Sequence, residues 1–218
     1  MLATTEPGRA CARCPRLAAF RNDNRAAWPD WHNAPVPSFG RGDARLLVVG
    51  LAPGLKGANR TGRPFTGDYA GDLLYGTLLD FGLAEGSYAA SPDDGLALQE
   101  TCITNAVRCV PPENKPTGPE ITACRPFLAA VIAAMPRLQA IVALGRIAHD
   151  TTLTALGARP ARHPFAHGAT HTVGRLTLFD SYHCSRYNTN TGRLTPQMFR
   201  AVFAAVRAHL DQADRPVA

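Results

Sequence analysis

Apolar residues gather in four short runs along the chain, each rich in Val, Ile, Leu or Thr. Near-continuous apolar runs of this length are typical of strands that are buried on both faces of a parallel sheet. Longer stretches with helical periodicity lie between them. The expected strands are Arg45–Leu51, Thr101–Val107, Gln139–Gly145 and Arg175–Ser181. The expected helices are Gly71–Phe81, Gly118–Met135, Arg146–Leu156 and Thr195–Leu210.

This alternation predicts an α/β fold: a single-domain, three-layer αβα sandwich around a short parallel sheet of about four strands. Such sheets hold ligands at the carboxyl ends of their strands. The first forty residues and the segment Ala158–Thr172 contain many turn residues and are expected to be irregular. One domain should span residues 1–218, with its ends at 1–10 and 211–218 frayed.

Composition narrows the class of protein. No apolar run approaches the ~20 residues that span a bilayer, and the N-terminus lacks a signal pattern, so we expect a cytoplasmic protein with no membrane partner. The formal net charge of +6 suits a polyanionic partner, because Lys and Arg neutralise phosphates and release counterions. Many basic proteins bind no nucleic acid, so net charge alone does not identify a nucleic-acid-binding protein and a binding site must also be found.

Six cysteines in such a chain argue against a disulfide framework, because the cytoplasm keeps thiols reduced. Four of them are spaced as ligands for one site: Cys11, Cys14, Cys109 and Cys124. Four thiolates suit either tetrahedral zinc or an iron–sulfur cluster, and spacing alone does not separate the two. Ordinary buried thiols are the alternative for Cys109 and Cys124, and Cys102 and Cys184 are assigned to the core.

A glycine-rich loop, Gly50–Asp68, follows the first strand. Its glycines would let backbone amides approach an anion, yet the spacings of a P-loop and of a dinucleotide-binding loop are both missing. The loop also contains Phe65 and Asp68. An aromatic ring and a carboxylate at the mouth of a sheet are what a planar base and an activated water would need.

Three segments resemble the motifs of iron–sulfur uracil-DNA glycosylases: Gly50–Asp68, Thr104–Pro116 and the His-containing loop His183–Thr195. Together with the cysteine spacing, the resemblance runs from Cys11 to Thr195. The long Asn-Arg-Thr-Gly-Arg-Pro-Phe-Thr-Gly-Asp run favours family 5 over family 4, whose first motif resembles G-E-A-P-G. Two departures stand out. Leu51 occupies the position of the acidic residue, and Cys184 replaces the proline of the usual His-Pro-Ser.

The resemblance implies an enzyme of DNA repair that hydrolyses the N-glycosidic bond of uracil in DNA and leaves an abasic site. It also implies tolerance of other deaminated bases such as hypoxanthine. The four cysteines would hold a structural [4Fe–4S] cluster, with zinc as the less favoured occupant. The expected partner is damaged DNA in the nucleoid, and the expected oligomeric state is a monomer.

Chemistry assigns roles to the motif residues. Asp68 would orient the attacking water, with Asp72 as its competitor, and His183 would donate to the base oxygen as negative charge develops there. Asn105 would read the Watson–Crick edge. The expected base-binding residues are Gly50, Ala52, Pro53, Gly54 and Phe65. The expected DNA contacts are Arg60, Arg63, Lys115, Ser185, Arg186, Tyr187, Asn188 and Arg193.

Two other classes of protein stay open from the sequence. One is a non-catalytic module that recognises DNA lesions through its metal and basic loop. The other is a hydrolase of nucleotides that is stabilised by a structural zinc ion.

Overall fold

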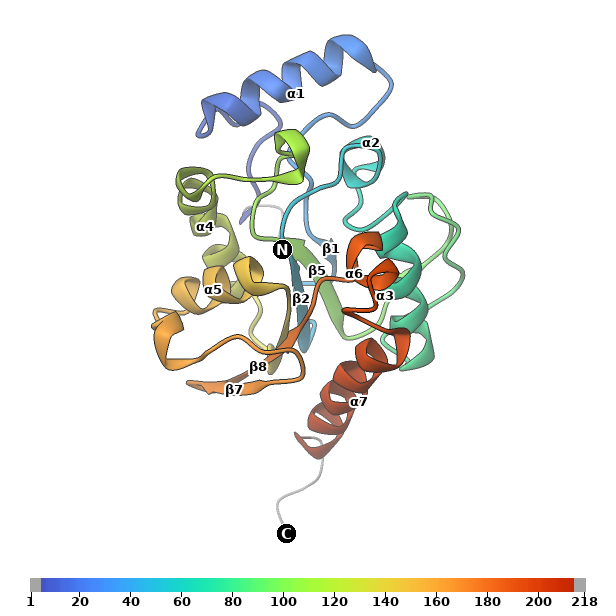
Figure 1. Cartoon of the computed structure of the whole chain (residues 1–218), viewed down its shortest axis with the longest axis vertical. Coiled ribbons are helices and arrows are strands. Elements are labelled where there is room, and N and C mark those ends of the chain that lie inside the picture. Colours follow the sequence, from blue (N-terminus) through green and yellow to red (C-terminus); the bar gives the residue numbers. More distant parts are fainter. Residues whose placement is uncertain (1–4, 214–218) are drawn as a thin grey trace.

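A computed structural model describes residues 5–213. Its main sheet has six strands in the order β1-β5-β2-β6-β8-β7 (Figure 1). The four central strands are parallel and coincide with the predicted ones: β2 (Leu46–Gly50), β5 (Thr101–Asn105), β6 (Ala140–Leu144) and β8 (Leu176–Ser181). A separate two-stranded ribbon pairs β3 (Ala84–Glu85) with β4 (Ala97–Leu98).

The predicted sheet of about four strands was too small, because two antiparallel edge strands extend it. These are β1 (Phe39–Gly40), paired with β5, and β7 (Thr170–Val173), paired with β8. The first is only two residues long, and the second contains Thr and His and is exposed at alternate positions. Neither therefore produces an apolar run.

Helices cover both faces of the sheet, so the predicted αβα layering is confirmed (Figure 1). On one face, Leu47 and Val49 of β2 pack with residues of α4 (Gly118–Ala133) and α5 (Arg146–Ala155). On the other face, Leu46 and Val48 pack with α3 (Tyr69–Asp80) and α7 (Pro196–Ala213). The four predicted helices exist, with ends that differ by a few residues. Two short helices, α2 (Ala58–Thr61) and α6 (Arg186–Asn190), lie in the motif loops.

The first forty residues are not irregular throughout, because α1 (Pro15–Ala27) forms there. Its buried residues are Leu17, Arg21 and Asn24, which share one helix face but are mostly polar, so hydrophobic periodicity does not reveal the helix. Arg16 of α1 donates two hydrogen bonds of 2.8 Å to Glu120 of α4. This pair fastens α1 to the helical layer.

The chain ends are more ordered than expected over the part that the structure describes. Glu6 forms an ion pair of 2.9 Å with Arg108, whose side chain is almost fully buried. At the other end, α7 continues to Ala213, past the expected fraying point at residue 211. The rest of the predicted frayed ends, 1–4 and 214–218, lies outside the described residues. Within residues 5–213, no helix has the length and apolar character needed to cross a membrane.

Candidate active site

Three segments that are far apart in sequence meet at the carboxyl ends of the parallel strands. The loop Gly50–Asp68 follows β2, Asn105 ends β5, and His183 follows β8. They surround a cleft of about 790 Å³. The predicted site residues that line it are Ala52, Pro53, Gly54, Phe65, Asp68, Asn105, His183, Ser185 and Arg186.

The first part of the glycine-rich loop continues the pairing of β2 with β5. The amides of Ala106 and Val107 each donate a hydrogen bond of 2.9 Å, to the carbonyls of Gly50 and Leu51 respectively. Gly50 does not line the cleft itself. It lies behind Asn105 and Phe65, and a Cβ at this position would lie 2.4 Å from Oδ1 of Asn105 and 2.5 Å from Cζ of Phe65. Glycine therefore makes room for two site residues.

Phe65 is held in an unusual backbone conformation. Its φ is +53°, which is uncommon for a residue other than glycine. The hydroxyl of Tyr88 donates a hydrogen bond of 3.2 Å to the Phe65 carbonyl, and that of Tyr75 donates one of 2.6 Å to the preceding carbonyl of Pro64. The ring packs into the core and also lines the cleft, where it stacks on His183 with ring centroids 5.9 Å apart.

Asp68 lies at the N-cap of α3 and lines the same cleft. Gly54 and Gly57 make room for it, since a Cβ on either would come within 3 Å of Oδ2 of Asp68. Burial raises the pKa of Asp68 above its usual range, although the backbone amides of Gly71 and Ala70 oppose the effect. Oδ1 of Asp68 is buried without a hydrogen-bond partner among the described residues.

His183 and Asn105 also have a buried polar atom without a hydrogen-bond partner. Nδ1 of His183 and Oδ1 of Asn105 are buried and lack partners within residues 5–213. Burial lowers the pKa of His183 to about 4, so its imidazole is neutral at physiological pH. A neutral ring carries one N–H and can donate a hydrogen bond without bringing a positive charge into the cleft. Buried polar atoms ordinarily have partners, so these three leave hydrogen-bonding positions at one cleft that a polar ligand or water would satisfy.

Exposed basic and aromatic side chains lie in the loops that supply the lining residues, and of these Arg186 and Tyr69 line the cleft themselves. Arg60, Lys115, Arg186 and Arg193 are exposed. The Arg186 guanidinium lies 5.3 Å from the centre of the Tyr69 ring. Tyr187, in helix α6, is 73% exposed. Ser185 caps this helix, and Nδ2 of Asn188 donates a hydrogen bond of 2.8 Å to the His183 carbonyl.

Arg63 is not among these exposed side chains. Its side chain is 5% exposed and forms two hydrogen bonds of 2.7 and 2.8 Å with the fully buried carboxylate of Asp94. The guanidinium also lies over the rings of Tyr75 and Tyr88. The prediction that Arg63 contacts DNA is therefore wrong, because its charge is already neutralised inside the protein.

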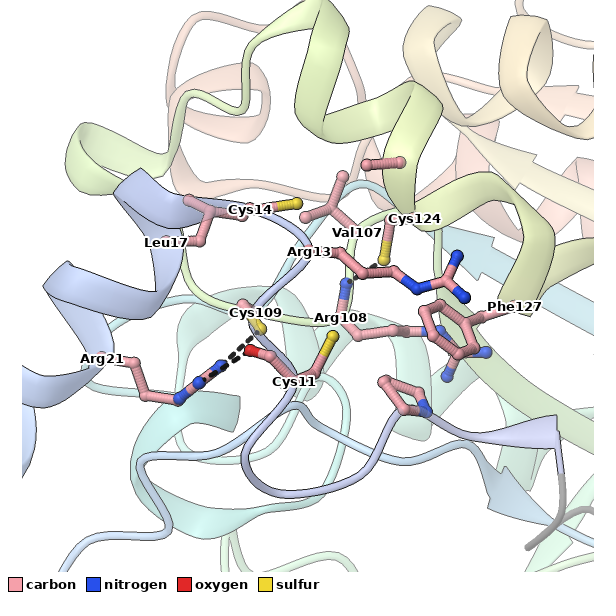
Figure 2. Close-up of a pocket in the computed structure, with 12 residues that line it drawn as sticks. Cys11, Arg13, Cys14, Leu17, Arg21, Val107, Arg108, Cys109, Cys124 and Phe127 are labelled. Atoms are coloured by element: carbon pink, nitrogen blue, oxygen red, sulfur yellow. Dashed lines mark hydrogen bonds between the residues drawn. The ribbon is translucent and has the colours of Figure 1, made fainter.

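The four predicted ligand cysteines come together at one place. Cys11 and Cys14 precede or cap α1, Cys109 follows β5, and Cys124 lies in α4, and all four line one small pocket (Figure 2). Arg21 donates a hydrogen bond of 3.3 Å to Sγ of Cys109. The backbone amide of Arg108 donates one of 3.3 Å to Sγ of Cys124. Donors of this kind stabilise thiolate ligands.

Comparison of the sequence with known proteins identifies the family of this chain. Residues 37–207 match the model of the uracil DNA glycosylase superfamily. A type-5 uracil-DNA glycosylase of Thermus thermophilus is 46% identical over 88% of this chain and 90% of its own. A type-5 enzyme of Pyrobaculum aerophilum is 41% identical over 91% of this chain and 88% of its own. A type-4 enzyme of Sulfurisphaera tokodaii is 30% identical, over 88% and 79%.

The chain belongs to the uracil-DNA glycosylase superfamily. Within it, the higher identities fall on the type-5 branch, in agreement with the resemblance of the first motif.

The two departures from the glycosylase motifs have different consequences. Leu51 lines the cleft but its side chain offers no polar atom, so a water there must be oriented by another residue. Cys184 is fully buried in the core, as predicted, and its thiol donates to the carbonyl of Ala70 in α3 at 3.5 Å. The thiol thus joins the His183 loop to the helix that begins beside Asp68.

Several lining residues of the glycosylase cleft were not among the predicted ones: Leu51, Leu55, Lys56, Gly57, Ala58, Gly67, Tyr69, Ala70 and Asn114. Asn114 stands out because it comes from the loop after β5 and has a φ of +57°. Its Pro-Pro-Glu-Asn-Lys-Pro surroundings indicate a tight turn, and this signal could have singled it out. Tyr69 follows Asp68 directly, and its exposure is not visible in the sequence.

Proposed function

We propose that this protein is a DNA repair enzyme that hydrolyses the N-glycosidic bond of uracil in DNA and leaves an abasic site. One observation carries the proposal: Asp68, Asn105 and His183 place three unpartnered buried polar atoms around one cleft, beside the ring of Phe65. Family membership supports it, because the relatives described above are uracil-DNA glycosylases.

The base must leave the helix before it can reach this cleft, because a stacked duplex shields the glycosidic bond. Phe65 supplies a face on which the extruded base stacks, which recovers about 1–3 kcal/mol of lost stacking. Asn105 lies at the end of β5 and bonds to the Watson–Crick edge of the base. The exposed residues Arg60, Lys115, Arg186 and Arg193 contact phosphates, and Tyr187 also approaches the duplex.

Bond cleavage leaves negative charge on the base and positive charge on the sugar. Neutral His183 donates its N–H to the base oxygen, where its contribution grows as charge develops. The Asp68 carboxylate faces the sugar cation and orients water for attack at C1′. Asp72 is less suitable, because its side chain is exposed in the first turn of α3 and does not line the cleft.

The four cysteines fit a [4Fe–4S] cluster better than zinc. Around tetrahedral zinc the sulfurs would lie about 3.8 Å apart, given a Zn–S distance of about 2.3 Å. Within residues 5–213, no three of these sulfurs lie within 4.8 Å of one another. A cubane separates its thiolates further, because each binds a different iron atom. When bound, the cluster supplies a structural cross-link between Cys11 and Cys14 and the segment that contains Cys109 and Cys124.

Other aspects of the function follow from the same proposal. The substrate is DNA that contains uracil or another deaminated base such as hypoxanthine, so we place the protein in the cytoplasm with the nucleoid. The cleft is built within one chain, and a monomer suffices for the reaction.

The experiment that tests the proposal is cleavage of a labelled duplex with one uracil opposite guanine, then opposite adenine, with hypoxanthine as a second lesion. Strand scission only after alkali identifies a glycosylase that leaves abasic sites. Asp68→Asn should lower the rate about 10²–10⁴-fold, whereas the matched variant Asp72→Asn should retain it. Damage-specific DNA binding without cleavage by the cluster-loaded wild type would instead favour a non-catalytic lesion-binding module.

A further inference from the structure

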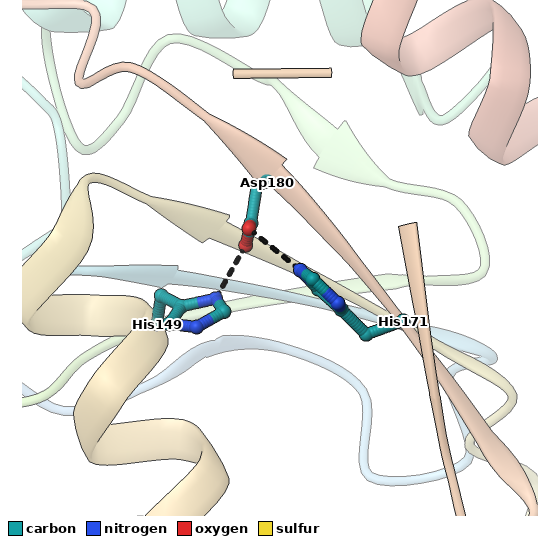
Figure 3. Close-up of side chains that lie close together, drawn as sticks. All are labelled: His149, His171 and Asp180. Atoms are coloured by element: carbon teal, nitrogen blue, oxygen red, sulfur yellow. Dashed lines mark hydrogen bonds and ion pairs between the residues drawn. The ribbon is translucent and has the colours of Figure 1, made fainter. Parts of the chain in front are cut away.

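A second group of polar side chains is buried on the α5 side of the sheet. Asp180 of β8 lies between His149 of α5 and His171 of β7 (Figure 3). Nδ1 of His149 is 2.6 Å from one carboxylate oxygen, and Nε2 of His171 is 3.0 Å from the other. The side chains of His149 and Asp180 are fully buried, and that of His171 is 11% exposed. None of the three lines the proposed active-site cleft.

An ionised Asp180 in this group requires a positive charge. An ionised carboxylate is costly to bury unless a cation pairs with it. Among the described residues, the ion pairs of Asp180 are those with the two imidazoles, which are charged only when protonated. If Asp180 is ionised, either protons on the rings or a bound metal ion must neutralise it.

The orientation of His149 suits a metal ligand. Its Nε2 lies 2.8 Å from the backbone carbonyl of His163. A carbonyl oxygen only accepts, so Nε2 carries a proton, and the lone pair of a neutral ring is then on Nδ1, which faces Asp180. Metal-binding histidines ordinarily donate their other N–H to a carbonyl or carboxylate in this way, and the bond fixes both the tautomer and the direction of the ring.

We propose that His149, His171 and Asp180 form a binding site for one divalent transition-metal ion, with zinc as the preferred occupant. Their ligand atoms all lie within 4.8 Å of one another. Two imidazole nitrogens and a carboxylate oxygen are a common ligand set for zinc. Tetrahedral zinc holds such atoms about 3.4 Å apart, given metal–ligand distances of about 2.1 Å. The present separations of 2.6 and 3.0 Å need to open by less than about 1 Å.

His163 is a candidate for a fourth ligand. Its ring lies edge-on to that of His171, with centroids 5.6 Å apart. Its carbonyl already holds His149, so the same residue would contribute to the site twice. A bound ion would join α5, β7 and β8 directly before the chain continues from Asp180 to His183. The site is therefore structural, and it supports the strand that leads to the active site.

Metal analysis of the cluster-loaded protein tests this proposal. After dialysis against zinc chloride at neutral pH, iron and zinc are measured together in the wild type and in His171→Gln. His171 is chosen because it lies on an edge strand and is the most accessible of the three. The matched control is His209→Gln in α7, a histidine that contacts Phe179 and lies outside the site. The wild type and the control should each bind one more zinc per chain than His171→Gln, with equal iron.

Two further measurements keep the test decisive if His171→Gln folds poorly. Cobalt added to the wild type should give ligand-field absorption without the intense charge-transfer bands of thiolate-bound cobalt. The absence of these bands distinguishes binding at the histidines and Asp180 from binding at the cysteines. The melting temperature of the wild type should rise with zinc concentration, as expected for an ion that binds only the folded state. Equal zinc contents in all variants, a thiolate-type cobalt spectrum or an unchanged melting temperature would overturn the proposal.

Discussion

Gly50→Ala should damage the active site although Gly50 itself does not line the cleft. Gly50 ends β2 and pairs in register with Asn105 of β5. The new Cβ would lie 2.4 Å from Oδ1 of Asn105 and 2.5 Å from Cζ of Phe65. Cβ atoms essentially never approach other heavy atoms more closely than 3.0 Å, so the methyl group must displace both of these side chains.

The size of the effect follows from these distances. To reach 3.4 Å, where ordinary van der Waals contact begins, Asn105 and Phe65 must each move by about 1 Å. A misplacement of about 1 Å in a site costs roughly 10²-fold in rate. Overpacking of the core should cost about 1–3 kcal/mol of stability. We therefore expect a folded protein with a lower melting temperature and a rate of uracil excision reduced about 10²-fold.

Single-turnover excision from a uracil-containing duplex, measured beside thermal unfolding, checks both numbers. The matched control is Gly76→Ala in the interior of α3, where an added Cβ meets no heavy atom within 4 Å. This control should gain about 0.5–1 kcal/mol of stability, because alanine is the better helix former, and should keep its excision rate. A wild-type rate in Gly50→Ala would refute the assigned roles of Asn105 and Phe65 together.

Three other predictions concern charge and the metal. Because burial raises the pKa of Asp68 and lowers that of His183 to about 4, the excision rate should rise with pH through the raised pKa of Asp68, and His183 should add no titration near neutral pH. Rate profiles should keep this acid limb in His183→Gln and lose it in Asp68→Asn. Arg63→Leu leaves Asp94 buried and unpaired and should cost about 3–5 kcal/mol by denaturant unfolding. Arg60→Leu should instead leave stability within about 0.5 kcal/mol. It should also reduce the salt dependence of DNA binding by about one unit of slope. Cys124→Ser should lower the bound iron and the visible absorption of the purified protein, whereas Cys102→Ser, at a buried cysteine outside the pocket, should leave the iron content unchanged.

The central fold was predictable because its signals are local. Each of the strands β2, β5, β6 and β8 is buried on both faces, so its sequence is a continuous apolar run. Helix α1 was missed for the opposite reason. The residues that it buries include Asn24 and Arg21, which donates to Sγ of Cys109 and to the carbonyl of Cys11, so the helix has no apolar stripe.

The site likewise contains residues that local sequence signals predicted and residues whose environment depends on distant parts of the chain. Motif spacing placed Asp68, Asn105 and His183 after strand ends, and the structure brings all three to one cleft. Arg63 lies in the same motif as Asp68, but its environment depends on Asp94, which comes after α3 and the first strand of the small ribbon. A positive charge in a loop is equally compatible with a phosphate contact and with a buried ion pair. Only the position of a carboxylate distant in sequence distinguishes the two.

The unpartnered atoms of the cleft also bear on base range. A buried polar atom without a partner costs about 1–3 kcal/mol, so a base that supplies the missing partners recovers this free energy on binding. Uracil and hypoxanthine each present an N–H next to a carbonyl oxygen on the Watson–Crick edge, whereas cytosine presents an acceptor next to an amino group. Oδ1 of Asn105 can accept from the N–H of either deaminated base, and neutral His183 can donate to a carbonyl oxygen but not to an amino group. With His183 at the position where cytosine has its amino group, the pair would detect deamination, which is why we extend the proposed substrates beyond uracil to hypoxanthine and exclude the parent base cytosine.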